Sequence, residues 1–458
     1  MATMVSAIHI SNCFHKKQLL EPTVKTKSRK ISKLNCKVCA SGTHRFDVVV
    51  VGAGIIGLSI ARDLLHRTNI SVAVVDAKVP CSGATGAGQG YLWMAHKTPG
   101  TDVWDLALRS QELWQLLAQT VHVQGIDPLE ALGWKKTGSL LIGRTEAELD
   151  QLKRRVQLLS AAGIRAEFLH RIDLATKEPK LEVGQESGAA FLPDDCQLDA
   201  YRTVAYIEKG NHLFESQGRY AEFYNDPAVS FLRSEGKGNI EGIKTKQHTL
   251  YGEKAIIIAA GCWSGSLMDD LLKDSDIVLH VPVKPRKGHL LVLENFNPLG
   301  LCHGLMEVGY VDRQHSISSS REVDDQALSI SMVASSDASG NLLIGSSRQF
   351  AGFNTDLDAS IVACIWERAQ LYFPALREFS LKNLSEELNV RIGLRPFMPD
   401  SKPVIGPVPG IPNLFLATGH EGSGLSMALG TAELITDMVL GNSSKVDSTP
   451  FAVEGRCC

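Results

Sequence analysis

The hydrophobic pattern is most regular between residues 46 and 76, where two apolar runs enclose a helical repeat. The first run, Phe46 to Val51, is rich in β-branched residues and predicts a strand that is buried on both faces. It breaks into glycines, and apolar residues then recur at helical spacing from Ile55 to Arg67. A second apolar run, from Ile70 to Val75, closes the segment. Strand, turn, helix and strand together predict one βαβ unit.

Three glycines and one acid in this unit stand where a dinucleotide would need them. Gly52 allows the tight turn, Gly54 lets backbone amides approach a pyrophosphate, and Gly57 lets the helix pack close to the strand. Asp76 follows the second strand, nineteen residues after Gly57, where a carboxylate can accept hydrogen bonds from an adenosine ribose. Such an acid disfavours the 2′-phosphate of NADP, while FAD and NAD stay open. A glycine-rich structural turn is the alternative.

Two later segments repeat this nucleotide-binding pattern, and a region with a different, β-rich pattern lies between them. A buried strand that ends on glycine at 255–261, and a strand, glycine-rich turn and helix at 414–439, resemble the nucleotide-binding unit. Between residues 283 and 346 the apolar runs are typical of an antiparallel sheet, interrupted by a polar stretch, Ser316 to Asp325, that predicts a mobile loop. We expect a disordered leader over 1–45, the nucleotide domain over 46–135, 201–280 and 391–440, the substrate domain over 136–200 and 281–390, and a flexible tail over 441–458.

The first 45 residues differ in composition from the rest. They contain nine Lys or Arg and a single acid, Glu21, with Ser and Thr between them. An acid-poor, basic, hydroxyl-rich leader is typical of an organelle transit peptide, and Val38-Cys39-Ala40 resembles a plastid processing site. We therefore expect a chloroplast location. A mitochondrial location and a retained basic tail are the alternatives.

Charge and cysteine usage exclude several other classes. Without the leader, the 47 basic and 50 acidic residues of the chain become 38 and 49, so the body is acidic and unsuited to nucleic acid. No apolar run approaches the length of a membrane span, so we expect no transmembrane segment. Beyond the leader, the seven remaining cysteines form no CxxC pair, so we expect no metal site.

Four segments resemble one family in order and spacing. They are the βαβ fingerprint, the Ser82-Gly83-Ala84-Thr85 loop, the segment from Ala259 to Ser264, and the Gly393-Leu394-Arg395-Pro396 segment with the following 400–406 and 417–420. Together they resemble the FAD-dependent D-amino acid oxidase superfamily, over essentially all of 46–440. The resemblance implies an α/β fold: an FAD-binding Rossmann-like domain that returns at the C-terminus, with an α+β substrate domain built on an antiparallel sheet. It implies FAD as the cofactor, held non-covalently because no His or Cys pair marks an attachment site.

The resemblance also implies cofactor contacts at both ends of the chain. Ser82, Ala84 and Thr85 would lie beside the pyrophosphate and flavin, Val229 would pack near the adenine, and Gly261 and Trp263 would close the site. The turn 419–424 would direct backbone amides at the flavin N1/O2 edge, where reduction places negative charge. A plain strand-to-helix connection is the alternative for this turn. The expected cofactor-binding residues are Gly52, Gly54, Gly57, Asp76, Ser82, Ala84, Thr85, Val229, Gly261, Trp263, Gly419, Gly422 and Gly424.

Three side chains are candidates for catalytic roles. In relatives an arginine in the position of Arg395 can bind the substrate carboxylate, and a guanidinium fork suits a planar anion; a structural ion pair is the alternative. Lys287 or the nearby His289 could face flavin or oxygen, or could be a solvated turn residue. His420 could lie at the flavin face. Tyr310 is a weaker candidate for a hydrogen bond to substrate.

The chain departs from the family pattern at two places. Many relatives end one strand with Pro-Arg, whereas this chain reads Val333-Ala334-Ser335-Ser336. This difference puts a second substrate arginine in doubt, and with it a simple small amino acid as substrate. The usual Asp-Pro is replaced by Asp199-Ala200.

The expected reaction is dehydrogenation of the C–N bond of an amino acid or amine, by hydride transfer to flavin N5. Oxygen or a quinone-type carrier would accept the electrons. Orientation carries most of such catalysis, so no strong base is expected. The alternatives are oxidation of a 2-hydroxy acid, which would need a histidine base, a flavoprotein scaffold without turnover, and an NAD-dependent dehydrogenase.

Overall fold

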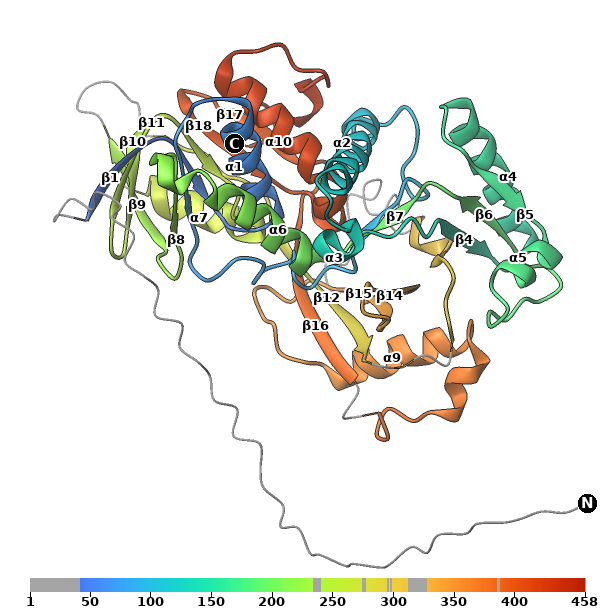
Figure 1. Ribbon diagram of the computed structural model, residues 1–458. Helices are drawn as coiled ribbons and strands as arrows, with labels where there is room; N and C mark the ends of the chain where they lie inside the picture. Colours follow the sequence, from blue (N-terminus) through green and yellow to red (C-terminus); the bar gives the residue numbers. More distant parts are fainter. Residues whose placement is uncertain are drawn as a thin grey trace, which may run out of the picture. The chain divides into compact units, whose positions relative to one another are not determined.

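The computed structural model describes residues 42–233, 240–273, 277–294, 296, 299–311, 328–384 and 388–457. Residues 1–41 of the expected leader, and the stretch from Ser316 to Asp325, lie outside this range. The described residues form two eight-stranded sheets and a two-stranded ribbon (Figure 1). None of their helices combines the length and the apolar character that crossing a membrane requires.

The first sheet is the one that the fingerprint predicts. Five of its strands run parallel, in the order β18, β11, β1, β2 and β8, because each is reached through a crossover connection. The apolar run of β1 is fully buried from Val48 to Val50, as a strand covered on both faces requires. The strands of this sheet are β1 (Thr43–Val51), β2 (Val72–Val75), β8 (Tyr220–Phe223), β9 (Ala228–Arg233), β10 (Ile240–Thr245), β11 (Thr249–Ile258), β17 (Val404–Val408) and β18 (Ile411–Thr418).

The second sheet carries the expected antiparallel region. Its order is β16-β12-β15-β14-β13-β4-β6-β5, and every neighbouring pair is antiparallel except β13 and β4. The strands are β4 (Ser139–Gly143), β5 (Glu167–Leu169), β6 (Gly188–Leu192), β12 (Lys284–Leu293), β13 (Gly304–Glu307), β14 (Ser329–Ser336), β15 (Leu342–Arg348) and β16 (Leu388–Phe397). The ribbon pairs β3 (Tyr91–Leu92) with β7 (Cys196–Gln197).

The structure differs from the expected domain boundaries at three places. Strand β1 begins at Thr43, so the last residues of the expected leader belong to the first sheet. Strand β16 pairs with β12 along its whole length, so residues 391–397 extend the substrate sheet, and the C-terminal return of the first domain begins with β17. The tail is not flexible over its described part, because Phe451 and Val453 are almost fully buried there.

Helices cover both sheets, and several begin at side chains that cap them. Asp199 accepts a hydrogen bond from the backbone N–H of Arg202 and so starts α6, although the proline usual after this acid is absent. The helices are α1 (Ile55–Arg67), α2 (Trp104–Val123), α3 (Pro128–Leu132), α4 (Glu146–Ala161), α5 (Arg171–Lys177), α6 (Ala200–His212), α7 (Ser264–Leu272), α9 (Ala359–Gln370) and α10 (Gly424–Leu440).

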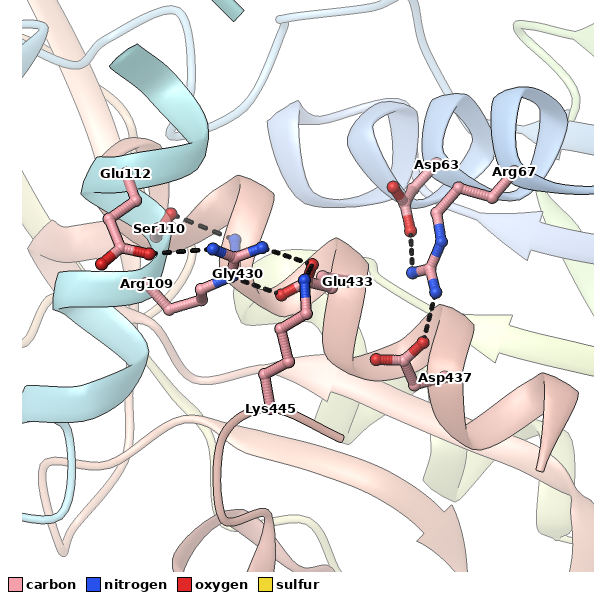
Figure 2. Close-up of polar contacts among 9 residues, drawn as sticks. All are labelled: Asp63, Arg67, Arg109, Ser110, Glu112, Gly430, Glu433, Asp437 and Lys445. Atoms are coloured by element: carbon pink, nitrogen blue, oxygen red, sulfur yellow. Dashed lines mark hydrogen bonds and ion pairs between the residues drawn. The ribbon is translucent and has the colours of Figure 1, made fainter. Parts of the chain in front are cut away.

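Helix α10 is anchored to α2 by a buried contact and an ion pair (Figure 2). A Cβ built on Gly430 would lie 3.0 Å from atoms of Leu106 and Ser110, so glycine allows the two helices to approach closely. Arg109 holds both carboxylate oxygens of Glu433, with Nε–Oε2 at 2.7 Å and Nη2–Oε1 at 2.8 Å. Such a bidentate pair fixes orientation as well as distance.

A second ion-pair group ties α10 to α1. Arg67 of α1 donates to Asp63 on its own helix at 2.9 Å and to Asp437 of α10 at 2.5 Å (Figure 2). Helix α10 is thus held on two sides. Because it begins at Gly424, these contacts also fix the position of the turn 419–424 that precedes it.

Candidate active site

The strands of the first sheet end at a common edge, and a cavity of about 630 Å³ opens there. Residues at or just beyond the ends of β1, β2, β11 and β18 line it, as expected for ligand sites at the carboxyl ends of parallel strands. The opposite wall comes from the second sheet, through β12 and β16. Among the predicted site residues, those that line the cavity are Gly52, Gly54, Asp76, Ser82, Ala84, Thr85, Gly261, Trp263, Arg395, His420, Gly422 and Gly424.

The glycines of the fingerprint are needed for steric reasons. Gly52 has φ of +119°, and a Cβ there would lie 2.3 Å from the carbonyl oxygen of Ala259. A Cβ on Gly57 would lie 1.9 Å from the carbonyl oxygen of Gly52, so Gly57 does not line the cavity but brings α1 against the strand. Both predicted roles follow from this geometry.

The start of α1 is open to the cavity. Its N-cap residue, Gly54, has no side chain that could cap the helix, and the first turn contains no acidic residue. Thr85 Oγ1 accepts from the backbone N–H of Ile55 at 3.2 Å, which brings the small-residue loop against the helix. Unpaired amides and the helix dipole make such a terminus suited to an anion.

Asp76 is fixed by the backbone around it. Its Oδ2 accepts from the N–H of Ala53 at 2.7 Å, and its Oδ1 accepts from the N–H of Lys78 at 2.7 Å. Each carboxylate oxygen can accept a further hydrogen bond. The residue therefore offers acceptors to a ribose at the end of β2.

Val229, the residue predicted to pack near the adenine, lies on β9. The structure places Val229 outside the cavity lining and leaves its side chain 44% exposed on β9, whereas Ala228 and Pro227 line the cavity. Alternate residues of a strand point to opposite faces, so a shift by one position turns the side chain away.

An aromatic pair stands at the cavity wall beside the small-residue loop. Trp263 stacks on Phe353, with ring centroids 5.9 Å apart and planes at 23°, and both rings line the cavity. A Cβ on Gly83 would lie 3.7 Å from the Trp263 ring. Gly261 precedes this pair with φ of +57°.

The turn before α10 lines the cavity through His420, Glu421 and Gly422, whereas Gly419 does not line it. Gly419 has φ of +80°, and a Cβ there would lie 2.4 Å from Met398 Cγ, so this glycine allows the close packing of the turn. Glu421 has φ of +47°, a conformation that is uncommon for residues other than glycine.

Arg395 reaches the cavity across the face of the second sheet. A Cβ built on Gly288 would lie 2.2 Å from Arg395 Nη1, so the guanidinium lies directly over this glycine. Nη1 donates to the carbonyl oxygen of Ser347 at 3.0 Å. Within the described residues no carboxylate lies within ion-pair distance of Arg395. The structure therefore does not show the structural ion pair that was the alternative for this residue.

Lys287 does not face the cavity. Its side chain is buried, and Nζ donates to Asn354 Oδ1 at 2.9 Å and to the carbonyl oxygen of Asp356 at 2.6 Å. It is thus neither a solvated turn residue nor a cavity residue, because the pleat of β12 directs it to the other side of the sheet from Gly288. Lys287 instead fixes the segment before α9.

His289 and His420 are both buried and are among the residues that line the cavity. The His289 side chain lies on the Lys287 face of β12, where its Nε2 accepts from the backbone N–H of Asp358 at 3.4 Å. His289 Nδ1 lies 3.0 Å from Ser347 Oγ, and burial together with Lys287 lowers its pKa to about 4. His420 Nε2 lies 2.9 Å from Thr431 Oγ1, and burial together with Lys97 lowers its pKa to about 3. Both imidazoles are therefore neutral at physiological pH.

The sequence comparisons identify the family of the chain. The family model DAO, described as FAD dependent oxidoreductase, matches residues 47–438. The chain belongs to this family. It is 26% identical over 415 residues to a glycine oxidase of Geobacillus kaustophilus, covering 90% of this chain and 97% of that protein. It is 28% identical to a D-amino acid dehydrogenase of Vibrio cholerae, covering 68% of this chain and 65% of that protein.

Solved structures show the same fold. The glycine oxidase from Geobacillus kaustophilus aligns with a TM-score of 0.73 at 24% identity, over 90% of this chain and 99% of that one. The L-proline dehydrogenase from P. horikoshii aligns with a TM-score of 0.73 at 17% identity, over 90% and 97%. The predicted fold class, with its nucleotide-binding and antiparallel-sheet parts, is confirmed.

As a DAO-family protein, the chain is an FAD-dependent oxidoreductase, and its cavity fits that cofactor. The open start of α1 offers amides to the pyrophosphate, and Asp76 offers acceptors to the adenosine ribose. The start of α10 and the turn before it line the other part of the same cavity, where backbone N–H groups favour negative charge.

Sequence reasoning missed three charged residues near this site. Lys97 is buried, its Nζ donates to Ser423 Oγ, and burial lowers its pKa to about 8. Glu421 lines the cavity, and Arg348 lies buried beside Tyr310. Arg348 lies two positions beyond Ser346, where the predicted apolar run ended, so the sequence pattern did not include it. No sequence pattern pointed to Lys97.

Proposed function

We propose that this FAD-dependent oxidoreductase oxidises the C–N bond of an amino acid or a related carboxylated amine. The observation that carries the proposal is the position of Arg395: a guanidinium with no carboxylate partner among the described residues, in the same cavity as the open start of α1. The names of the relatives support it, since both glycine oxidase and D-amino acid dehydrogenase denote enzymes for amino acids.

Arg395 binds the substrate carboxylate in this proposal. A guanidinium presents two parallel N–H donors that match a planar carboxylate. The Tyr310 hydroxyl offers a further donor close to Arg395. A Cβ built on Gly422 would lie 3.8 Å from Tyr310 Oη and 3.9 Å from Arg395 Nε. Its contact with Tyr91, at 2.7 Å between the hydroxyl oxygens, fixes that hydroxyl.

The residues orient the substrate rather than removing its α-proton. Bound FAD would supply the acceptor for the hydride of the α-carbon, and water would hydrolyse the imine product. Neither cavity histidine suits the base that oxidation of a 2-hydroxy acid requires, because groups with pKa of about 3 and about 4 hold a proton poorly at neutral pH. These pKa values favour the amine over the hydroxy acid as substrate.

The deciding experiment is anaerobic bleaching of the purified, FAD-loaded protein. Glycine, sarcosine, D-amino acids, secondary amines and 2-hydroxy acids are added separately, and loss of the flavin absorption is followed. We expect bleaching by amines that carry a carboxylate. A scaffold protein would bind FAD and be bleached by dithionite but by none of these compounds.

Arg395→Gln tests the role of the guanidinium. It should raise the substrate KM strongly and leave FAD content unchanged. Arg154→Gln, which removes an exposed arginine on α4, is the matched control. An Arg395→Gln protein with the KM of the wild type would refute the assignment.

The electron acceptor and the cell compartment extend the proposal. Oxygen or a quinone-type carrier reoxidises the cofactor, and peroxide production in air distinguishes the two. The basic leader directs the protein to the chloroplast, with the mitochondrion as the alternative. Residues 1–45 fused to a fluorescent protein should enter one of these organelles, and diffuse cytosolic fluorescence would contradict the transit peptide.

A further inference from the structure

Three neighbouring strands of the second sheet each carry one arginine on the face toward the cavity; Arg395 lines the cavity, and Arg286 and Arg348 are buried beside it. The strands are β16, β12 and β15, and the arginines are Arg395, Arg286 and Arg348 (Figure 1 shows the strands). Arg286 and Arg395 are directly opposite each other in the register of β12 and β16. Ser346 of β15 lines the cavity, and Arg348 stands two residues further along, so it leaves the same face. We call these three residues the arginine row.

The arginine row holds more positive charge than its protein surroundings neutralise. Like charges opposite each other on adjacent strands destabilise a sheet, and burial increases the cost. Among the described residues, Glu421 is the carboxylate that contacts the row, with Oε1 at 3.2 Å from Arg286 Nη1. Burial alone would raise the pKa of Glu421, but Arg286, Arg395 and Arg348 lower it. Three cations thus share one carboxylate.

Arg348 has an unused pair of donors. The residue is 2% exposed, and its Nε and Nη2 have no hydrogen-bond partner among the described residues. Nε–H and the neighbouring Nη2–H form the side-on fork that accepts both oxygens of one carboxylate. Buried donors are nearly always satisfied in folded proteins, so an anion is the missing partner that fits this geometry.

Tyr310 connects Arg348 to the place where Arg395 acts. Arg348 Cζ lies 3.9 Å from the centroid of the Tyr310 ring, and that ring lines the cavity. The Tyr310 hydroxyl and Arg395 Nε each lie within 4 Å of a Cβ built on Gly422, as described above. The two guanidiniums therefore serve the same end of the cavity, one near the hydroxyl of Tyr310 and the other at its ring.

We propose that Arg348 is a second carboxylate subsite, and that the preferred substrates are short amino acids or amines with two carboxylates. Arg395 binds one carboxylate and Arg348 the other. The inference rests on the proposed function for the identity of the reacting group, and on the arginine row alone for the second anion. A dicarboxylate supplies the two negative charges that the row lacks, whereas a monocarboxylate supplies one.

Binding of ligands that cannot be oxidised tests the subsite without turnover. The FAD-loaded protein is titrated with succinate and with butyrate, which have equal chain lengths, and the change in the flavin spectrum gives each Kd. We expect succinate to bind at least about tenfold more tightly than butyrate, because a second charge-assisted bidentate contact adds at least that factor. Arg348→Gln should remove this difference and leave the Kd of butyrate within about twofold of the wild type. The control Arg154→Gln should keep the difference.

Equal Kd values for succinate and butyrate in the wild type would overturn the proposal, as would an Arg348→Gln protein that still prefers succinate. Arg348→Lys keeps the charge but lacks the fork, and it should lose most of the preference. If neither variant retains FAD, the ratio of the two wild-type Kd values decides alone.

Substrate oxidation separates the two proposals. Anaerobic bleaching by D-aspartate and iminodiacetate is compared with bleaching by D-alanine and sarcosine. Faster reduction at low concentration by the dicarboxylates supports both proposals. Reduction by amines without any preference for dicarboxylates keeps the proposed function and rejects the subsite. No reduction by any amine, with succinate still bound through Arg348, rejects the proposed function and keeps the subsite.

Discussion

Gly288 offers a way to move Arg395 without changing Arg395 itself. A Cβ at position 288 would lie 2.2 Å from Arg395 Nη1, 2.6 Å from Nη2 and 2.7 Å from Cζ. These distances are far below contact, so in Gly288→Ala the guanidinium must leave its place. The backbone of Gly288 does not adopt the left-handed conformation, and the obstacle is the end of a flexible side chain. We therefore expect the fold to tolerate the change.

The size of the effect follows from the interaction that is lost. A hydrogen bond to a charged group contributes about 1.5–3 kcal/mol. Because 1.4 kcal/mol corresponds to a factor of ten, the Kd of a carboxylated substrate should rise about 10- to 150-fold. FAD content should stay at the wild-type level, since Gly288 belongs to the second sheet and the start of α1 would hold the pyrophosphate.

The assay is anaerobic flavin reduction, which yields the substrate Kd and the limiting rate separately. Gly210→Ala is the control, because a Cβ there would meet nothing within 4 Å. The decisive variant is Gly288→Ala combined with Arg395→Gln. If both changes act through the same guanidinium, the double variant should bind no more weakly than Arg395→Gln alone. Losses that multiply, or a Gly288→Ala protein with an unchanged Kd, would refute the reasoning.

Three further predictions follow from other parts of the site. Gly52→Ala should abolish FAD retention and lower Tm by several degrees, because its Cβ would lie 2.3 Å from Ala259 O at φ of +119°; thermal unfolding and the absorption ratio measure both. Burial lowers the pKa of Lys97 to about 8. The positive charge of Lys97, near the turn at Ser423, is present below about pH 8 and lost above it. The FAD midpoint potential should therefore fall more steeply with pH around pH 8 in the wild type than in Lys97→Met. Equal slopes of potential against pH in the two proteins would contradict this. Acid precipitation should release all yellow colour into the supernatant, and colour in the pellet would disprove non-covalent binding.

The parts of the site that local sequence patterns encode were predictable. The glycines at 52 and 57 and the acid at 76 belong to one βαβ unit, in which the spacing along the chain determines which residues come into contact. The structure gives each of them a steric or hydrogen-bonding reason. Family resemblance then distinguished FAD from NAD, which spacing could not do.

The sequence predictions differ from the structure where the assignment of one strand, or of one residue to a face of a strand, matters. Strand β16 carries the family motif with Arg395 but pairs with β12 of the substrate sheet. The domain boundary predicted at residue 391 therefore falls inside a strand of that sheet. Val229 and Lys287 each lie one position from a residue that lines the cavity, Ala228 and Gly288. A motif can locate a strand, but the face that each of its residues takes depends on the pleat and on the neighbouring strands.

The arginine row shows what a linear motif cannot contain. Its members come from three strands that are distant in the sequence, and only the antiparallel pairing of β12 with both β15 and β16 brings them together. The absence of Pro-Arg before residue 337 put a second substrate arginine in doubt, but the strand after it, β15, carries Arg348 on the face toward the cavity. Charge at a site therefore depends on the sheet as a whole. Three cations beside one carboxylate destabilise a buried sheet, so we expect an anionic ligand, such as the proposed carboxylated substrate, to stabilise the arginine row.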